Sequence, residues 1–257
     1  SGFQLYGYHR AYSFQVKQVA VPIKNLPLPF SGFRIAQITD LHVGPFITKD
    51  FVERVVAQVN DLRPDLIAIT GDLVDGSVDE LRDHVAPLGK LKSSQGTFFV
   101  TGNHEFYSGA DPWCEHLSSM GMIVLRNQMQ SLQKDFSQIQ IAGIEDWSSK
   151  RFGEGPNLEK ACLGADPALP LILLSHQPKS FSAAQKRGVS LQISGHTHGG
   201  QIWPIGHLIP IIYSPYVRGL YKANESHIYV SCGTGFWGPP LRLDAPSEVT
   251  LIELQKA

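Results

Sequence analysis

Apolar and polar residues change their spacing in blocks along the first half of the chain. Phe33–Thr39 and Leu66–Thr70 are short apolar runs of the kind that forms buried strands. Lys49–Leu62 instead repeats apolar residues at helical spacing, and Val78–Leu91 has the same pattern. Thr97–Thr101 is again a short apolar run. Strand, helix, strand, helix and strand with short connections predict an α/β layered sheet.

The second half of the chain has mainly short strand patterns. The pattern predicts strands at Met122–Leu125, Ser131–Lys134, Gln138–Ile144, Leu171–Leu174, Leu191–Ser194, Ile228–Ser231 and Val249–Leu254. Helical spacing returns at Leu158–Leu163 and Pro178–Arg187, and an edge strand is expected earlier, around Tyr12–Val21. No stretch is typical of a linker. We therefore expect residues 1–257 to form a single domain, a four-layer α-β-β-α sandwich of two mixed sheets.

The composition is ordinary for a globular protein and excludes few classes. Apolar residues make up 42% of the 257 residues, charged residues 18%, and the formal net charge is −1. No run or face of Lys and Arg is visible, so no nucleic-acid partner is expected. Cys114, Cys162 and Cys232 are far apart, which predicts small core residues and no disulfide framework.

The chain has no apolar run of about 20 residues, the length that a transmembrane helix requires. It begins with Ser-Gly and not with Met. An N-terminal anchor or signal could therefore have been removed ahead of it.

Five clusters of His, Asp and Asn residues each follow a predicted strand. They are Asp40-Leu-His42, Gly71-Asp72-Leu-Val-Asp75, Gly102-Asn103-His104-Glu105, Ser175-His176 and Gly195-His196-Thr-His198. Each cluster alone is typical of an exposed turn. Because the carboxyl ends of the strands in an open α/β sheet form one edge, we expect all five loops to converge there.

The side chains in these clusters suit metal ions. Neutral imidazole and carboxylate groups bind Mn, Fe, Zn and similar divalent ions. No cluster contains a thiolate, which disfavours a structural zinc site. The glycines before Asp72, Asn103 and His196 are expected to let the backbone turn sharply and approach an ion closely.

The blocks DLH, GDLVD, GNHE, SH and GHTH, in this order between Asp40 and His198, resemble the calcineurin-like metallophosphoesterase superfamily. The extension GHTHGGQIWPIG resembles a subgroup of small bacterial phosphoesterases that are exported or membrane-anchored. Tyr229-Val-Ser-Cys-Gly-Thr-Gly and Pro240-Leu-Arg-Leu also resemble that subgroup. The resemblance runs from Phe33 to the end of the chain and implies a bacterial cell envelope or membrane-associated location.

The resemblance implies a centre of two divalent metal ions. The first ion would be held by Asp40, His42 and His198. The second would be held by Asn103, His176 and His196, and Asp72 would bridge the two. We expect Mn²⁺, with Fe, Zn, Mg, Ni and Co as alternatives.

The resemblance also implies a catalytic role for two further residues. His104 would contact the phosphate and act as the general acid, and Asp75 would orient His104. Two cations about 3.5–4 Å apart neutralise phosphoryl oxygens and lower the pKa of a bound water. A general acid then neutralises the leaving alkoxide. The expected activity is hydrolysis of a phosphodiester, pyrophosphate or phosphomonoester.

The substrate is indicated more weakly than the reaction. Residues 201–213 are apolar and broken by proline, which is typical either of a hairpin packed on the core or of an apolar rim that holds an acyl chain or touches a membrane surface. The subgroup that the motifs resemble includes enzymes that cleave UDP-diacylglucosamine, and an apolar rim would suit such a lipid-linked substrate. Arg218 and Arg242 are candidates for contact with a substrate phosphate, and a surface role is an equal alternative for both.

Two alternative functions are weighed against this one. A non-catalytic scaffold with the same fold is disfavoured, because every ligand position and His104 are present. A nuclease is disfavoured by the lack of a basic groove.

Overall fold

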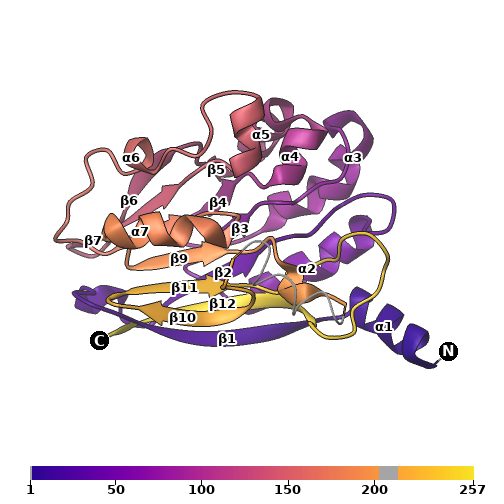
Figure 1. Cartoon of the computed structure of the whole chain (residues 1–257), viewed down its shortest axis with the longest axis horizontal. Helices are drawn as coiled ribbons and strands as arrows, with labels where there is room; N and C mark the ends of the chain where they lie inside the picture. The colour runs from indigo at the N-terminus through magenta and orange to yellow at the C-terminus, as the bar shows by residue number, and fades with distance from the viewer. Residues whose placement is uncertain (1, 203–213) are drawn as a thin grey trace.

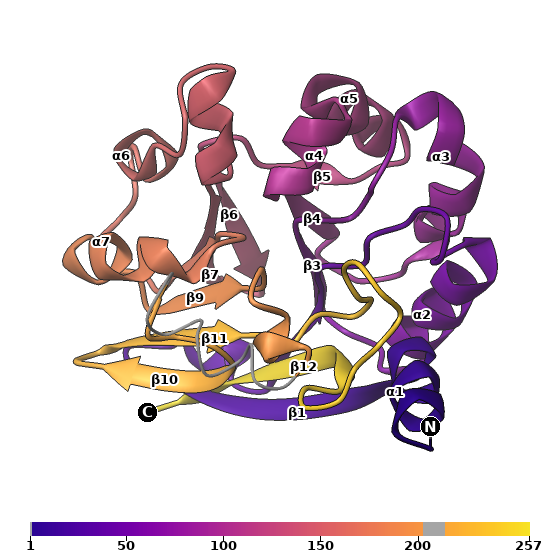
Figure 2. The same cartoon turned by 45° about the vertical axis from the view of Figure 1, so that its right-hand side comes forward.

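The computed structural model of the protein describes residues 2–202 and 214–257. Two six-stranded sheets pack face to face, and helices cover both outer sides (Figures 1 and 2). This arrangement confirms the predicted α-β-β-α sandwich of two mixed sheets.

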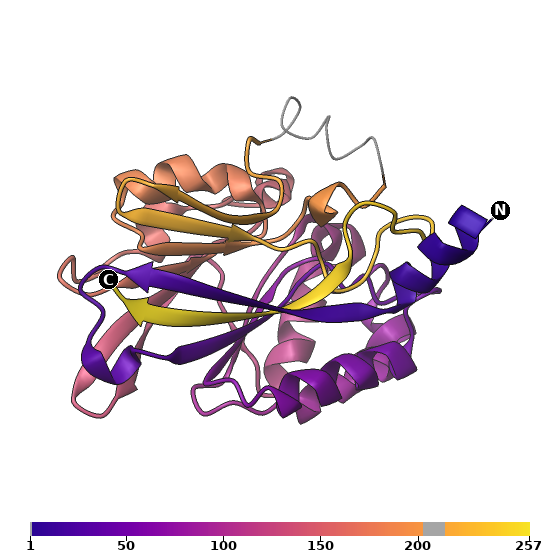
Figure 3. The same cartoon turned by 90° about the horizontal axis from the view of Figure 1, so that it is seen from below.

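The first sheet has the strand order β1-β12-β2-β3-β4-β5. Its strands are β1 (Phe14–Ile23), β2 (Phe33–Ile38), β3 (Leu66–Thr70), β4 (Thr97–Val100), β5 (Ile123–Val124) and β12 (Ser247–Lys256). Strands β2 to β5 are parallel, and β12 is antiparallel to β2. Strand β1 lies at the edge of this sheet beside β12 (Figure 3). This position confirms the edge strand that was predicted around Tyr12–Val21.

The second sheet has the strand order β10-β11-β9-β8-β7-β6. Its strands are β6 (Gln128–Lys134), β7 (Ser137–Gly143), β8 (Leu171–Leu174), β9 (Leu191–Ser194), β10 (Gly219–Ala223) and β11 (Ser226–Val230). Strands β7, β8, β9 and β11 are parallel, and the two outer strands are antiparallel to their neighbours.

The core is divided into layers by the alternation of side chains along each strand. In β3, Leu66 and Ala68 pack between the two sheets, whereas Ile67 and Ile69 pack beneath the helices. Helices on the first sheet are α2 (Lys49–Asp61), α3 (Val78–Val85) and α5 (Ala110–Ser119). Helices on the second sheet are α6 (Leu158–Ala161) and α7 (Phe181–Lys186), which lie on the opposite side in Figure 2. A strand that is buried on both faces has apolar residues at nearly every position. The central strands of the two sheets are therefore recognisable in the sequence.

The structure differs from the sequence prediction at several elements. The predicted helix over Val78–Leu91 is wrong beyond Val85, where a 3-10 helix (Ala86–Lys90) follows. Pro87 has no backbone N–H to continue the α-helical ladder. The helices α1 (Gly2–Tyr12), α4 (Asn103–Ser108) and α5 and the strand β10 were not predicted.

Helix α1 forms because of tertiary contacts. Helix α1 is not amphipathic in sequence and projects from one end of the molecule (Figure 3). The Tyr12 ring lies 5.2 Å from the Phe236 ring, and the backbone N–H of Arg242 donates to the carbonyl of Gly7. The helix is thus held by a segment more than 200 residues later in the chain.

Candidate metal centre

The five sequence clusters lie on loops that directly follow β2, β3, β4, β8 and β9. The strands come from both sheets, and a buried glutamine ties the sheets together next to the loops. The amide nitrogen of Gln37 on β2 donates to the Thr70 hydroxyl (2.8 Å) on β3 and to the Ser194 carbonyl (2.9 Å) on β9. The expected convergence of the five loops is therefore observed.

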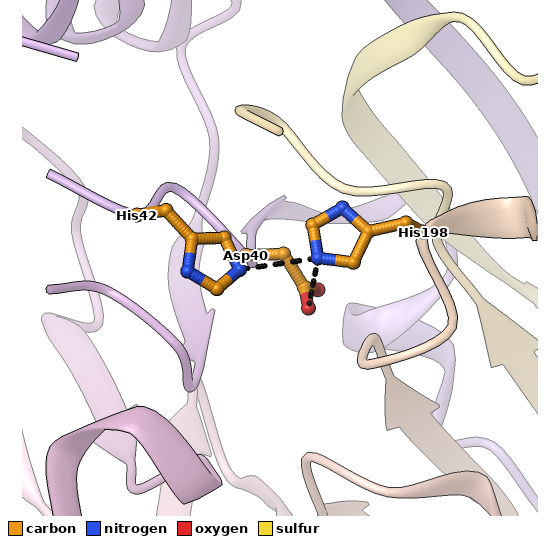
Figure 4. A group of neighbouring side chains, drawn as sticks. All are labelled: Asp40, His42 and His198. Atoms are coloured by element: carbon orange, nitrogen blue, oxygen red, sulfur yellow. Dashed lines mark hydrogen bonds and ion pairs between the residues drawn. The ribbon is translucent and has the colours of Figure 1, made fainter. Parts of the chain in front are cut away.

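One group of possible ligands consists of Asp40, His42 and His198 (Figure 4). The Nε2 atoms of His42 and His198 lie 3.1 Å apart, and His198 Nε2 lies 3.4 Å from Asp40 Oδ1. Two imidazole nitrogens and a carboxylate oxygen that face one another are a donor set that divalent metal ions fit. All three residues are buried.

A second group consists of Asp72, His176 and His196. His176 Nε2 lies 3.1 Å from both Asp72 Oδ2 and His196 Nδ1. Asn103, the first residue of α4, belongs to the predicted ligands of the same ion. Its Oδ1 atom is buried and has no hydrogen-bond partner among the described residues. A buried unsatisfied oxygen is costly in a folded protein, so this atom fits a ligand of an ion.

Asp72 lies between the two groups. Its Oδ2 atom is 3.1 Å from His176 Nε2 in the second group and 3.9 Å from His42 Nε2 in the first. The same atom is 4.0 Å from His104 Nε2. One carboxylate oxygen therefore faces both groups and the predicted acid.

Asp75 joins the predicted acid to the first group. Its Oδ1 atom lies 2.8 Å from His42 Nδ1 and 2.7 Å from His104 Nδ1. Burial raises the pKa of Asp75, but the hydrogen bonds from His104 and His42 outweigh it and lower the pKa to about 2. An ionised Asp75 accepts from both Nδ1–H groups, so the Nε2 atoms of both rings are directed to the centre.

The backbone is unusual at five of the predicted ligand positions. Asp40, His42, Asp72, His196 and His198 all have positive φ, between 50° and 72°. Such conformations are costly for residues other than glycine, and they persist where surrounding contacts enforce them. At Asp40, the carboxylate accepts a hydrogen bond from the backbone N–H of His196 at 3.0 Å, which fixes one ligand loop against the other.

The glycines beside the ligands are needed for two different reasons. Gly71 has a φ of 87°, as the expected sharp turn requires. Gly102 has an extended φ of −99°, but a Cβ there would overlap the carboxylate of Asp72. A Cβ at Gly195 would overlap the carboxylate of Asp40. The prediction of a sharp turn is thus confirmed at Gly71, whereas the other two glycines provide space.

Glu105 lies next to the predicted ligands and is not among the residues predicted for the site. Its buried carboxylate accepts hydrogen bonds from the backbone N–H groups of Asp72 (3.0 Å), Leu73 (2.7 Å) and Gly102 (2.6 Å). Burial and the charge of Asp72 raise the pKa of Glu105 to about 7. The residue holds the loop after β3 against the start of α4. Its position three residues after Gly102 is the capping-box position, which is the signal that could have identified it.

Three of the histidines predicted as ligands differ in pKa because their neighbours differ. Burial and the neighbouring His176 lower the pKa of His196 to about 4. Burial and the charges of His42 and Arg242 lower the pKa of His198 well below its ordinary value. Burial also acts on His176, but the adjacent Asp72 carboxylate outweighs it and raises the pKa. His196 and His198 are therefore neutral near pH 7, which is the state that metal ligation needs.

The two arginines proposed for phosphate contact lie in different surroundings. Arg242 is only 1% exposed, and its guanidinium donates to the carbonyls of His198, Gly235 and Ala245. Its Nη2 atom also lies 3.1 Å from His198 Nδ1. The prediction is wrong for Arg242, because these bonds occupy the guanidinium inside the protein. Arg218 is partly exposed and pairs with Asp244 (3.4 Å).

Residues 203–213, which include most of the predicted apolar rim, lie outside the described residues. None of the helices in the described part of the chain has the length and apolar character that a membrane crossing needs.

Two packed sheets with helices on both outer sides thus bring two groups of possible metal ligands together at the ends of their strands. A family model described as calcineurin-like phosphoesterase matches residues 33–200. The chain is 37% identical over 253 residues to a Danio rerio protein named transmembrane protein with metallophosphoesterase domain, covering 95% of this chain and 58% of that protein. It is 41% identical over 224 residues to an uncharacterized metallophosphoesterase of Helicobacter pylori, covering 86% of this chain and 59% of that protein. The chain belongs to the calcineurin-like phosphoesterase family.

A solved structure shows the same fold at low sequence identity. It is a putative 5'-nucleotidase from Staphylococcus aureus, with a TM-score of 0.52 and 11% identity, and the match covers 87% of this chain and 54% of that chain. The chain spans less than two thirds of the length of the two curated relatives above.

Proposed function

We propose that this chain hydrolyses phosphoester bonds with a centre of two divalent metal ions. The observation that carries the proposal is the position of Asp72 Oδ2, which lies between His176 Nε2 at 3.1 Å and His42 Nε2 at 3.9 Å. One oxygen shared by two imidazole-rich groups suits a bridging ligand.

The ligand roles follow the two groups. The first ion would be held by Asp40, His42 and His198, the second by Asn103, His176 and His196, and both by Asp72. Imidazole, carboxylate and amide oxygen donors suit Mn²⁺, and they also suit Fe, Zn, Mg, Ni and Co. Mn²⁺ is our proposal for the resident ion.

The bound ions would neutralise phosphoryl oxygens and lower the pKa of a bound water. The chain itself supplies the proton for the leaving group. Burial lowers the pKa of His104, but the hydrogen bond with Asp75 and the charges of Asp72, Asp75 and Glu105 outweigh it and raise the pKa above the ordinary value. A protonated His104, whose side chain is partly exposed, can deliver its proton to the leaving group.

The substrate we propose is a phosphodiester or pyrophosphate, with phosphomonoesters as a simpler alternative. A lipid-linked substrate such as UDP-diacylglucosamine remains our preferred example, and it rests on the resemblance to the subgroup and on the apolar sequence of residues 201–213. Membrane contact through this segment and a cell-envelope location are proposed on the same basis. The relative from Danio rerio that is named a transmembrane protein supports a membrane setting for the related proteins.

An activity screen on protein with measured metal content tests the proposal. It should cover p-nitrophenyl monoesters and diesters, nucleotides and lipid-linked pyrophosphates. Hydrolysis that disappears with a chelator and returns with Mn²⁺ is expected. A fully metal-loaded protein that cleaves none of these compounds contradicts the proposed function, and cleavage of monoesters alone contradicts the substrate preference.

A further inference from the structure

A pocket of about 510 Å³ lies beside α4, between α5 and the segment that follows β7. Its lining includes Phe106, Arg126, Glu145 and Phe152, none of which belongs to the proposed metal centre. The volume falls within the range of small-molecule sites in proteins.

Both walls of this pocket begin next to segments that carry proposed ligands. Phe106 is three residues after Asn103 on α4, which places their Cβ atoms about 5–6 Å apart. The opposite wall starts at Asp146, which caps the 3-10 helix Trp147–Arg151 through the backbone N–H of Ser148. Asp146 also accepts a hydrogen bond from Gln177, the residue after His176, at 2.8 Å. The elements that form the two walls are therefore attached to the loops that carry proposed ligands.

The pocket offers an aromatic surface. The rings of Phe106 and Phe152 are stacked, with centroids 5.9 Å apart and planes inclined by 18°. Phe106 is almost buried, whereas Phe152 is 65% exposed. A flat ring in the pocket would gain stacking contact at low entropic cost.

Next to the rings lies a fixed pair of polar groups. Arg126 Nε donates to Glu145 Oε1 at 2.6 Å, and Arg126 also pairs with Asp111. Among the described residues, no hydrogen bond uses Glu145 Oε2 or Arg126 Nη2. A ligand therefore meets a hydrogen-bond acceptor beside a donor, which complements a planar ring edge that carries an N–H next to a carbonyl or ring nitrogen.

The charges of the lining exclude other ligand classes. Arg126 and Lys160 are positive, whereas Asp111, Glu145 and Glu154 are negative, so the pocket does not favour an anion. An acyl chain would remove these charged groups from water without compensation.

We propose that this pocket binds the nucleobase of a nucleotide-containing substrate, with Phe152 stacking on the base and Glu145 and Arg126 binding its polar edge. This inference rests on the proposed phosphoesterase function, since the phosphate of the same substrate would lie at the metal centre. It also leaves any lipid part of the substrate outside this pocket.

The test compares two chromogenic diesters that share a leaving group. One is the p-nitrophenyl ester of thymidine 5'-phosphate, and the other is p-nitrophenyl methyl phosphate, which has no base. We expect Phe152→Ala to lower kcat/KM for the thymidine ester relative to kcat/KM for the methyl ester by about fivefold or more, because the variant loses the stacking between the base and the aromatic ring. Phe136→Ala, which removes a fully exposed phenylalanine at the β6–β7 turn, is the matched control and should leave the ratio unchanged. Glu145→Gln, compared with Glu53→Gln on the surface of α2, tests the polar edge in the same way.

A second readout does not depend on turnover. Saturation-transfer NMR on the metal-free protein with guanosine or uridine should show contact to the base protons, and Phe152→Ala should weaken it. If the wild type cleaves both esters but Phe152→Ala leaves the ratio unchanged, the pocket inference is overturned and the proposed function stands. If neither ester is cleaved, the proposed function fails. If, in addition, Phe152→Ala does not weaken nucleoside binding, the pocket inference is overturned as well.

Discussion

Asp75 Oδ1 lies 2.7 Å from His104 Nδ1, and this contact fixes which nitrogen of the His104 ring faces the centre. The carboxylate holds the proton of Nδ1, so Nε2 is left to exchange a proton with a substrate. The contact also raises the pKa of His104 against the effect of burial. The pH dependence of activity should therefore report on this pair.

Asp75→Asn should move the alkaline limb of the pH profile to lower pH. A general acid must be protonated to act, so activity falls as pH rises through the pKa of His104. The variant loses the negative charge that raises this pKa and keeps only a neutral amide oxygen as a weaker acceptor, while burial still lowers the pKa. The measurement is kcat/KM against pH for a substrate with a poor leaving group. A limb that stays in place or moves to higher pH would show that Asp75 does not control the acid.

His104→Asn should lower kcat by roughly 10²–10⁴-fold for an alkyl ester. The loss should be much smaller for p-nitrophenyl esters, because p-nitrophenolate leaves without a proton. Metal content should stay at the wild-type value, since His104 is not a proposed ligand. An equal loss for both leaving groups would contradict the role of His104 as an acid and favour a role in phosphate binding.

Asp72→Asn should reduce both metal content and activity. The variant removes the charge of the oxygen that faces both ligand groups. Metal content is measured by plasma mass spectrometry on protein purified with added Mn²⁺. In the wild type, metal at 100 times its Kd should stabilise the fold by about 2.7 kcal/mol, which a thermal melt with and without chelator detects. A variant that binds no metal but retains its full role in cells would favour the scaffold alternative.

Glu105→Ala should lower the free energy of unfolding by about 2 kcal/mol or more. The change leaves the backbone N–H groups of Asp72, Leu73 and Gly102 without their acceptor in a buried place. Urea unfolding of the metal-free protein measures the effect. The control is Glu53→Ala on the exposed face of α2, which should change stability by less than about 0.5 kcal/mol. Equal stabilities of the two variants would show that the carboxylate of Glu105 does not hold the loops together.

The local sequence pattern was sufficient for much of the fold. Runs such as Leu66–Thr70 are buried on both faces, and their apolar character is visible without any knowledge of neighbours. The amphipathic spacing of Lys49–Asp61 reveals a helix for the same reason. Helix α1 has no such pattern, because contacts with Phe236 and Arg242 stabilise it, and the sequence does not show such distant partners.

The sequence by itself determined most of the strands and the clusters at their ends, because runs and clusters are local features, whereas the roles of the nine residues proposed as ligands, acid and orienting group come from the resemblance of those clusters to a known family. Only the tertiary structure decided how these residues face one another. Asp72 Oδ2 faces both groups of predicted ligands. Arg242, which follows His198 by 44 positions in the chain, contacts the ring of His198. Such contacts depend on how two sheets pair and pack, and the free energy of that packing is spread over residues far apart in the sequence.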